Sequence, residues 1–221
     1  MAALMIGHAL RSRVQELQTR LRRAYPEAQC ALNFTTPLEL LIATILSAQC
    51  TDVRVNLVTP ALFQRYRTAA DYAAAEVAEL ERTIQTTGFY RQKARTIQSC
   101  CSVLLHQYHG EVPDTMEALV ALPGVGRKTA NVVLGNAFGR PEGIAVDTNV
   151  QRLAHRLGLT SATTPEKIEE DLLALVPRND WTHFSHLLIS HGRAVCKARA
   201  PACAACPVYD LCPAAQHAAA G

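Results

Sequence analysis

Apolar residues recur at helical spacing along almost the whole chain. In the N-terminal segment 8–24, the positions Leu10, Val14, Leu17 and Leu21 fall on one face of a predicted amphipathic helix, with arginines elsewhere. No segment alternates apolar and polar residues for long enough to predict a β-strand. The pattern therefore predicts an all-α fold.

The most apolar predicted helix covers residues 38–48. The Thr-Pro pair at 36–37 is typical of a helix start, and Glu39 is placed to complete a capping box. This helix is apolar nearly all round, so we expect other helices to surround it. Asp52 is predicted to cap the helix that follows, over 53–66.

The helical pattern continues on both sides of the middle of the chain. Short helices are predicted within 69–86, and a long amphipathic helix over 90–105. Beyond residue 147 the pattern predicts helices over 149–157, 165–175 and 181–195, where threonine or aspartate precedes the last two. Helical patterns therefore recur along the chain as far as residue 195.

A glycine-containing turn separates two of these helices. The segment Leu122–Ala130 reads Leu-Pro-Gly-Val-Gly-Arg-Lys-Thr-Ala. Pro123 and Gly124 end the preceding helix, and helical spacing resumes after Gly126. Such a hairpin leaves backbone N–H groups at the start of the second helix without helical partners, which suits a phosphate. The alternative for an isolated Gly-x-Gly is an ordinary turn between helices.

Two residues near this hairpin carry candidate chemistry. Lys128 falls in the first turn of the second helix, where the positive end of the helix dipole disfavours an ammonium ion, as a nucleophilic lysine requires. Asp147 follows an irregular connection, and its carboxylate could stabilise positive charge or transfer protons. The alternative for Lys128 is a solvated phosphate contact. Asp147 could instead only cap the next helix, or Thr148 and Gln151 could do so as a capping box.

Four of the eight cysteines lie close together near the C-terminus, at Cys196, Cys203, Cys206 and Cys212. Their loop is short and rich in proline and alanine, so a metal centre would give it order. Structural zinc usually takes two closely spaced pairs, whereas only the middle two cysteines form a C-x2-C pair. A [4Fe-4S] cluster accepts unevenly spread thiolates. The spacing by itself leaves both zinc and iron–sulfur open.

The composition is that of an ordinary globular protein, with 49% hydrophobic and 19% charged residues. The net charge of +3 permits nucleic-acid binding without indicating it. The N-terminus lacks the pattern of a secretory signal, and no apolar run is as long as a membrane span, so we expect a cytoplasmic protein without a membrane partner. Thiols stay reduced in that compartment, so disulfides are not expected.

The hairpin segment Leu122–Val133, followed by Val146–Thr148, resembles the helix-hairpin-helix and catalytic aspartate of the endonuclease III family of DNA glycosylases. The resemblance extends upstream through Leu46–Asp52 and Gly88–Ala94, and downstream to the last cysteine. It covers nearly the whole chain. It implies a two-lobed helical fold with DNA bound across the groove between the lobes, and a [4Fe-4S] cluster in the C-terminal loop.

The resemblance also implies a role for each motif. Lys128 and Asp147 are the expected catalytic residues. Gln49 is expected to enter the DNA gap left by an extruded base, and Phe89 to act as a wedge between bases. The same cysteine spacing in relatives implies that the four cysteines bind [4Fe-4S], and argues against zinc. The hairpin residues expected to contact DNA are Gly124, Val125, Gly126, Arg127 and Thr129.

Two domains are expected. Residues 29–142 form a central helical domain that contains the helix-hairpin-helix at about 115–138. Residues 1–28 and 143–221 form a discontinuous helical domain with the cluster loop at 196–212.

The expected function is that of a bifunctional DNA glycosylase/AP lyase of base excision repair. It would act as a monomer on double-stranded DNA with damaged bases or abasic sites, remove oxidised pyrimidines through a lysine Schiff base, and cleave 3′ to the lesion. One alternative is a monofunctional adenine glycosylase acting opposite 8-oxoguanine, although such enzymes typically lack the lysine and carry a further C-terminal domain. The other alternative is a non-catalytic helix-hairpin-helix DNA-binding module. Many relatives have histidine where this chain has Asn149, so the lesion spectrum rests on resemblance alone.

Overall fold

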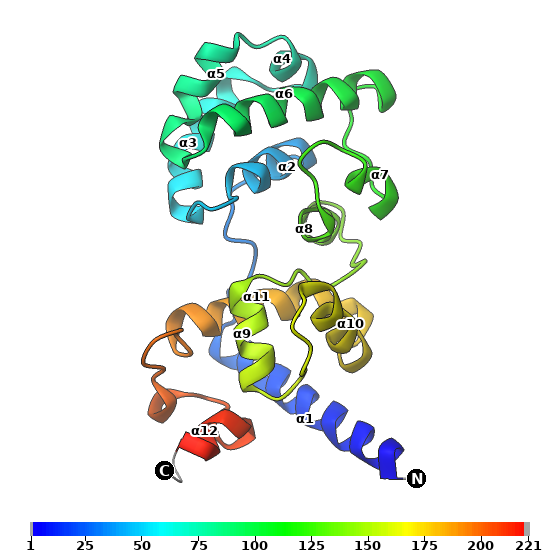
Figure 1. The fold of residues 1–221 in the computed structure, drawn as a ribbon, viewed down its shortest axis with the longest axis vertical. Coiled ribbons are helices and arrows are strands. Elements are labelled where there is room, and N and C mark those ends of the chain that lie inside the picture. The colour runs from blue at the N-terminus through cyan, green and yellow to red at the C-terminus, as the bar shows by residue number, and fades with distance from the viewer. Residues whose placement is uncertain (1, 219–221) are drawn as a thin grey trace. The chain divides into compact units, whose positions relative to one another are not determined.

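The computed structural model describes residues 2–218, and the side chains of residues 8–216. These residues form helices and connecting loops, with no β-strand among them, which confirms the predicted all-α fold (Figure 1). None of the described helices is long and apolar enough to span a membrane. The chain divides into two compact units, one of residues 30–140 and the other of the residues before 30 and after 140.

The unit of residues 30–140 is built around the apolar helix α2 (Pro37–Leu46). Six of its ten residues are buried, as expected for a helix surrounded by others. Its helices pack into one hydrophobic core, in which α2 contacts α3, α6 and α8. The remaining helices of this unit are α3 (Asp52–Arg65), α4 (Ala69–Ala73), α5 (Val77–Ile84), the short 3-10 helix η1 (Gln85–Thr87), α6 (Tyr90–Gln107), α7 (Met116–Val120) and α8 (Arg127–Ala137).

The other unit combines the N-terminal helix α1 (Ala2–Ala24) with the C-terminal part of the chain. Val14, Leu17 and Leu21 of α1 are fully buried in its core, in agreement with the amphipathic pattern. Helix α11 lies against both α1 and α9. The remaining helices are α9 (Thr148–Arg156), α10 (Pro165–Leu175), η2 (Arg178–Asp180), α11 (Trp181–Ala194), η3 (Cys203–Ala205), η4 (Tyr209–Leu211) and α12 (Pro213–Ala218).

Two predicted helix caps differ from the structure. Helix α3 is capped by Thr51, whose hydroxyl accepts a hydrogen bond from the amide of Arg54, so Asp52 is the first helical residue and not the cap. At α2 the hydroxyl of Thr36 accepts from the amide of Glu39, as predicted. The Glu39 carboxylate, however, accepts from the amide of Thr35 at 2.5 Å. The reciprocal bond of the capping box therefore goes to the residue before the cap.

Candidate active site and cluster loop

The hairpin between α7 and α8 has two glycines that differ in what surrounds them. Gly124 has φ +76, and a Cβ at this position would lie 2.2 Å from the Cγ2 atom of Thr96 on α6. Its lack of a side chain is thus required both by the backbone and by the packing. Gly126 has φ −89, and a Cβ there would meet no atom within 4 Å. The hairpin is consequently packed against α6 at Gly124 and open at Gly126.

Gly126 is the N-cap of α8 and, having no side chain, gives no side-chain cap. The start of this helix thus offers backbone N–H groups and a positive dipole end towards open space, which favours an anion. Val125 differs from the other hairpin residues. Its side chain is buried, and its amide donates to the Leu122 carbonyl at 3.1 Å. The structure therefore uses the Val125 amide inside the turn, and the donors for a phosphate must come from other residues.

Lys128 lies in the first turn of α8, on an exposed stretch that also includes Arg127, while Thr129 is half-buried. This first turn contains no acidic residue. Within the described residues Lys128 makes no side-chain hydrogen bond or ion pair. Its amine is therefore accessible and not held by a carboxylate of the same unit.

Asp147 is the N-cap of α9. Its Oδ1 atom accepts hydrogen bonds from the amides of Asn149 and Val150, each at 2.8 Å. The predicted capping box of Thr148 and Gln151 does not form, because Asp147 takes the cap position one residue earlier and the Gln151 side chain donates to the Thr163 carbonyl. Capping occupies one carboxylate oxygen, so the cap and a catalytic role are compatible.

The second carboxylate oxygen begins a chain of hydrogen bonds that the sequence did not reveal. Oδ2 of Asp147 accepts from the side-chain amide of Asn149 at 3.1 Å. The Oδ1 atom of Asn149 accepts from Nη2 of Arg152 at 3.0 Å, and the same nitrogen donates to the carbonyl of Cys196 at 3.1 Å. Asn149 and Arg152 are three positions apart, which makes them neighbours on a helix. This spacing is the only feature of the sequence that indicates their contact. The aspartate is thus connected to the first cysteine of the C-terminal loop.

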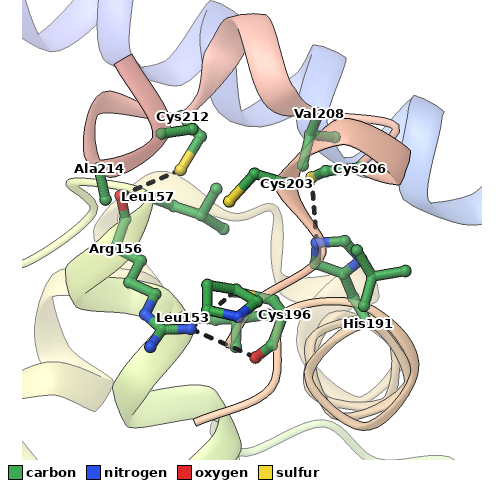
Figure 2. Close-up of a pocket in the computed structure, with 13 residues that line it drawn as sticks. Leu153, Arg156, Leu157, His191, Cys196, Cys203, Cys206, Val208, Cys212 and Ala214 are labelled. Atoms are coloured by element: carbon green, nitrogen blue, oxygen red, sulfur yellow. Dashed lines mark hydrogen bonds between the residues drawn. The ribbon is translucent and has the colours of Figure 1, made fainter. Parts of the chain in front are cut away.

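The four C-terminal cysteines line one cavity of about 130 Å³ (Figure 2). Apolar side chains complete its wall, among them Leu153 and Val208. Among the described residues no three His, Cys, Asp or Glu side chains converge as ligands of a single metal ion. The four cysteines instead share the lining of this one cavity. Such a cavity fits a multi-atom iron–sulfur cluster.

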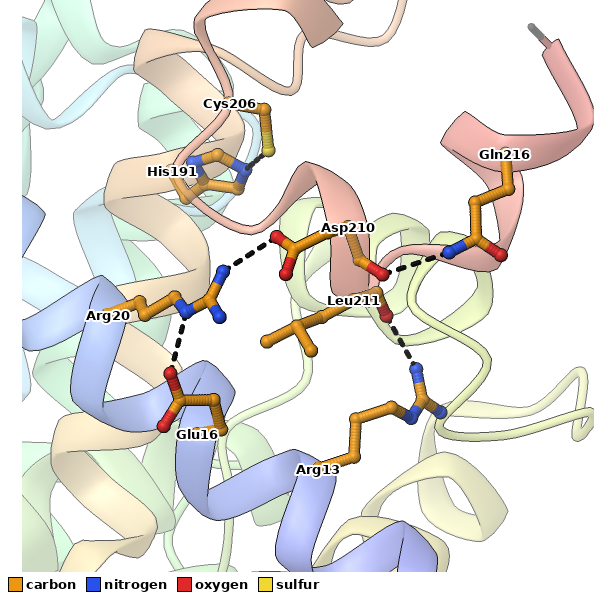
Figure 3. Close-up of polar contacts among 8 residues, drawn as sticks. All are labelled: Arg13, Glu16, Arg20, His191, Cys206, Asp210, Leu211 and Gln216. Atoms are coloured by element: carbon orange, nitrogen blue, oxygen red, sulfur yellow. Dashed lines mark hydrogen bonds and ion pairs between the residues drawn. The ribbon is translucent and has the colours of Figure 1, made fainter.

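Arginines hold the loop around this cavity. Nη1 of Arg156 lies 3.3 Å from Sγ of Cys196 and donates to the carbonyl of Lys197 at 2.8 Å. Arg13 of α1 donates to the carbonyls of Leu157 and Leu211 at 2.7 and 2.9 Å (Figure 3). These guanidinium groups hydrogen-bond to backbone carbonyls in the cluster loop and at the end of α9, so they hold in place the backbone that carries the cysteines.

A buried histidine contacts one of the cysteines. Nε2 of His191 lies 3.4 Å from Sγ of Cys206 (Figure 2). Nδ1 of the same ring lies 2.8 Å from the hydroxyl of Tyr25. Burial lowers the pKa of His191 to about 4, so the imidazole is neutral near pH 7. The tyrosine and the sulfur together fix the ring orientation. Neither Tyr25 nor His191 carried a recognisable sequence signal.

The two residues expected to enter DNA are both exposed and both adopt left-handed backbone conformations. Gln49 follows α2 and has φ 51, and Phe89 precedes α6 and has φ 47. The side chain of Phe89 is 66% exposed, which is unusual for a large aromatic residue. Both belong to the unit of residues 30–140, as does Lys128, whereas Asp147 and the four cysteines belong to the other unit.

Comparison with known proteins identifies two family regions. Residues 42–178 match the model of the HhH-GPD superfamily base excision DNA repair proteins, and residues 196–212 match the iron-sulfur binding domain of endonuclease III. Endonuclease III of Synechocystis sp. is 54% identical over 206 residues, which cover 93% of this chain and 94% of the relative.

Solved structures agree with this assignment. A non-covalent endonuclease III–DNA complex has a TM-score of 0.90 at 43% identity, covering 96% of this chain and 99% of that protein. A trapped endonuclease III–DNA covalent intermediate has a TM-score of 0.89 at 44% identity, covering 95% and 98%. The cofactor is accordingly a [4Fe-4S] cluster. The chain belongs to the endonuclease III family of the HhH-GPD superfamily of base excision DNA repair proteins.

Proposed function

We propose that this protein is a bifunctional DNA glycosylase/AP lyase that acts on damaged duplex DNA in base excision repair. The observation that carries the proposal is the exposed Lys128 in the first turn of α8, two residues after an N-cap without a side chain, in a chain of the endonuclease III family. A relative with 44% identity was captured as a covalent intermediate with DNA, and a nucleophilic side chain is what such an intermediate requires.

Lys128 supplies the nucleophile. The target nucleotide must first leave the base stack, because its C1′ carbon is unreachable inside the duplex. The neutral amine then attacks C1′, the bond from C1′ to the base breaks, and the base leaves with its bonding electrons and takes a proton. Opening of the sugar ring gives a Schiff base, loss of a C2′ proton breaks the C3′–O bond, and water finally releases the lysine.

Asp147 stabilises the positive charge that develops on the sugar and assists the proton transfers. Its Oδ1 atom is occupied by two amides of α9, and its Oδ2 atom by the Asn149 side chain. These hydrogen bonds fix the direction of the carboxylate. The proposal requires Lys128 and Asp147 to act on the same deoxyribose in the DNA complex.

The hairpin holds the DNA backbone. The open space at Gly126 admits a phosphate, the α8 dipole favours it, and Arg127 adds positive charge. Gly124 sets the turn, Val125 anchors it in the core, and Thr129 lies at its edge. Gln49 and Phe89 fill the space that the extruded nucleotide leaves, since unstacking exposes base faces that these side chains can cover.

Cys196, Cys203, Cys206 and Cys212 hold the [4Fe-4S] cluster, which gives this loop a rigid core. Base release and elimination consume no electrons, so the role of the loop residues in the reaction is structural. Arg156 and Arg13 keep the loop backbone in place, and Arg152 connects it to Asn149 and Asp147. The cluster loop therefore helps to hold Asp147 in place through the hydrogen bonds of Arg152 and Asn149.

The two compact units correspond to the two lobes of a glycosylase, with the helix-hairpin-helix in residues 30–140 and the cluster in the other unit. We further propose that the protein works as a cytoplasmic monomer on chromosomal DNA. Oxidised pyrimidines such as thymine glycol are its proposed substrates.

The deciding experiment is borohydride trapping on a duplex with a single thymine glycol. The wild type should form a covalent adduct, and Lys128→Ala should form none. Lys167→Ala, which removes another exposed lysine, is the matched control and should trap normally. Base release without an adduct in the wild type would indicate a monofunctional glycosylase. Neither an adduct nor base release on thymine glycol or on an abasic duplex would leave only a DNA-binding module.

A further inference from the structure

The two segments proposed to enter DNA share an unusual backbone feature. Gln49 and Phe89 have φ values of 51 and 47, a region that side-chain-bearing residues rarely adopt. Gly88, beside Phe89, also has a positive φ of 72, which glycine adopts without strain. Strained conformations of this kind persist only where the surrounding structure holds them, and they gather at sites that must be preorganised. The structure must therefore contain something that holds these two segments.

One buried lysine contacts both. The side chain of Lys93, on α6, is only 5% exposed. Its Nζ atom donates to the carbonyl of Leu46 at 2.7 Å and to the carbonyl of Thr87 at 2.8 Å. Leu46 is the last residue of α2, three positions before Gln49, and Thr87 is the last residue of η1, two positions before Phe89. A single ammonium group thus joins the starting points of the two segments.

The backbone of the same residue reinforces the contact. The amide of Lys93 donates to the carbonyl of Phe89 at 3.0 Å, so Lys93 holds the chain on both sides of Gly88. The last carbonyls of a helix have no partner within the helix, and an ammonium group at the C-terminal end of α2 is favoured by the helix dipole. Burial lowers the pKa of Lys93, so its charge opposes burial and these bonds must offset that cost. An apolar residue would be buried here at a lower cost in free energy. The presence of lysine therefore indicates that its two hydrogen bonds, to Leu46 and Thr87, are the function of this position.

We propose that Lys93 is a positioning residue that fixes the segments carrying Gln49 and Phe89 as one preorganised wedge for the DNA gap. The inference rests on the proposed role of Gln49 and Phe89. Both segments are then already ordered when the protein folds, so DNA binding does not bear the entropy cost of ordering them. This strengthens binding to DNA with an extruded nucleotide without adding a contact to the DNA. Lys93 acts through the two exposed side chains and touches no reacting atom.

The test compares Lys93→Met with Arg91→Met. Methionine keeps the unbranched shape of lysine and removes its donors. Arg91 is the second residue of α6, two positions before Lys93, and its side chain is exposed and lies over the ring of Tyr90. Arg91→Met therefore removes one positive charge, as Lys93→Met does, without removing a hydrogen bond to Leu46 or Thr87. The probe is a duplex with a tetrahydrofuran abasic analogue and 2-aminopurine opposite it, whose fluorescence reports unstacking.

Lys93→Met should lose most of the fluorescence rise and bind the analogue duplex about tenfold more weakly relative to undamaged duplex. Arg91→Met should keep the fluorescence rise and lose affinity equally for both duplexes. The rate of borohydride trapping at an abasic site, measured at saturating enzyme, should change less than threefold in Lys93→Met. A normal fluorescence rise in a folded Lys93→Met protein would overturn the proposal.

A double-variant comparison separates positioning from general stability. In a Gln49→Ala/Phe89→Ala background, Lys93→Met should cause no further loss of affinity for the analogue duplex. An equal further loss would mean that Lys93 does not act through these side chains. If Gln49→Ala/Phe89→Ala itself leaves unstacking unchanged, the proposed role of the two residues fails, while trapping by Lys128 still tests the enzyme assignment independently.

A measurement on the wild type covers the case in which Lys93→Met does not fold. The amides of Ala48, Cys50 and Gly88 each donate a hydrogen bond within their own turn. Native-state hydrogen exchange should give these three amides similar protection factors, because the two segments open together. Protection factors that differ by more than tenfold between the two segments would show that they open independently, and would overturn the inference.

Discussion

The side-chain amide of Asn149 donates a hydrogen bond to Oδ2 of Asp147 at 3.1 Å, while its carbonyl oxygen accepts from Arg152 at 3.0 Å. An asparagine can do both at once because it carries a donor and an acceptor on one planar group. A histidine here would also have one donor and one acceptor on its neutral ring, but it would titrate near neutral pH. Asn149 thus makes the orientation of the aspartate independent of pH in this range.

Asn149→Ala should lower the rate of base release about tenfold. A hydrogen bond to a charged group contributes roughly 1.5–3 kcal/mol, and 1.4 kcal/mol corresponds to a factor of ten in rate. The measurement is single-turnover base release from a thymine glycol duplex. Gln151→Ala, on the same helix, bonds to the Thr163 carbonyl and not to Asp147, so it should react at the normal rate. Equal rates for Asn149→Ala and wild type would contradict this support of the carboxylate.

Asp147→Asn should separate the cap from the chemistry. Asparagine caps helices about as well as aspartate, so the thermal midpoint should stay close to that of the wild type. The loss of the negative charge should slow base release by roughly 10²–10³-fold. Asp147→Ala should lose the same activity and, in addition, about 1 kcal/mol of stability, because α9 then lacks its cap. Retained base release in Asp147→Asn would show that Asp147 only caps the helix.

The two hairpin glycines should respond differently to alanine. Gly124→Ala places a methyl group 2.2 Å from Thr96 at a positive φ, so it should destabilise the protein by roughly 1–3 kcal/mol in urea unfolding. Gly126→Ala meets open space at an ordinary φ, so stability should hardly change. It should instead weaken DNA binding, because the methyl group takes space next to the expected phosphate. Similar effects of the two variants on both stability and binding would contradict this division.

Stability should fall in mild acid through His186. Burial, then His183 and Arg193, lower the pKa of His186 from 6.5 to about 4. The unfolded chain therefore binds the proton first, so the stabilisation is complete above pH 6.5 and is lost as the pH falls towards 4. His186→Gln should reduce the loss of unfolding free energy across this range, by an amount on the order of 1–3 kcal/mol. His106→Gln, at an exposed position, should leave the pH dependence unchanged.

Arg156→Lys should reduce the retention of iron. Lysine keeps the charge but cannot reproduce the guanidinium contacts with Cys196, Lys197 and Ala198. Iron per protein and the visible absorbance should both decline faster than in the wild type during incubation with a chelator. Arg11→Lys, an exposed arginine of α1 that bonds to the Ala174 carbonyl, is the control. Equal iron loss in both variants would mean that the guanidinium contacts do not retain the cluster.

Features that depend on neighbours in the sequence could be predicted from it. The start of α2 at Thr36 and Pro37 and the end of α10 before Pro177 follow from caps and from proline, which act within three or four residues. The helix-hairpin-helix and the cysteine spacing are likewise local, and they were enough to identify the family. Even among local features, two adjacent candidates such as Thr51 and Asp52 could not be ranked, since both residue types cap helices well.

Contacts between residues far apart in the chain were decided only by the tertiary structure. Lys93 reads as one more polar residue of an amphipathic helix, and only packing brings its ammonium group to Leu46, 47 positions away. His191 meets Tyr25 across 166 positions in the same way. The sequence by itself determined the helices and the hairpin, because hydrogen bonds within a few residues specify them. It also identified the family, because the motifs that carry the resemblance are short stretches of sequence. The tertiary structure decided which buried polar groups meet, because a buried donor must be paired by whatever acceptor the packed helices bring next to it.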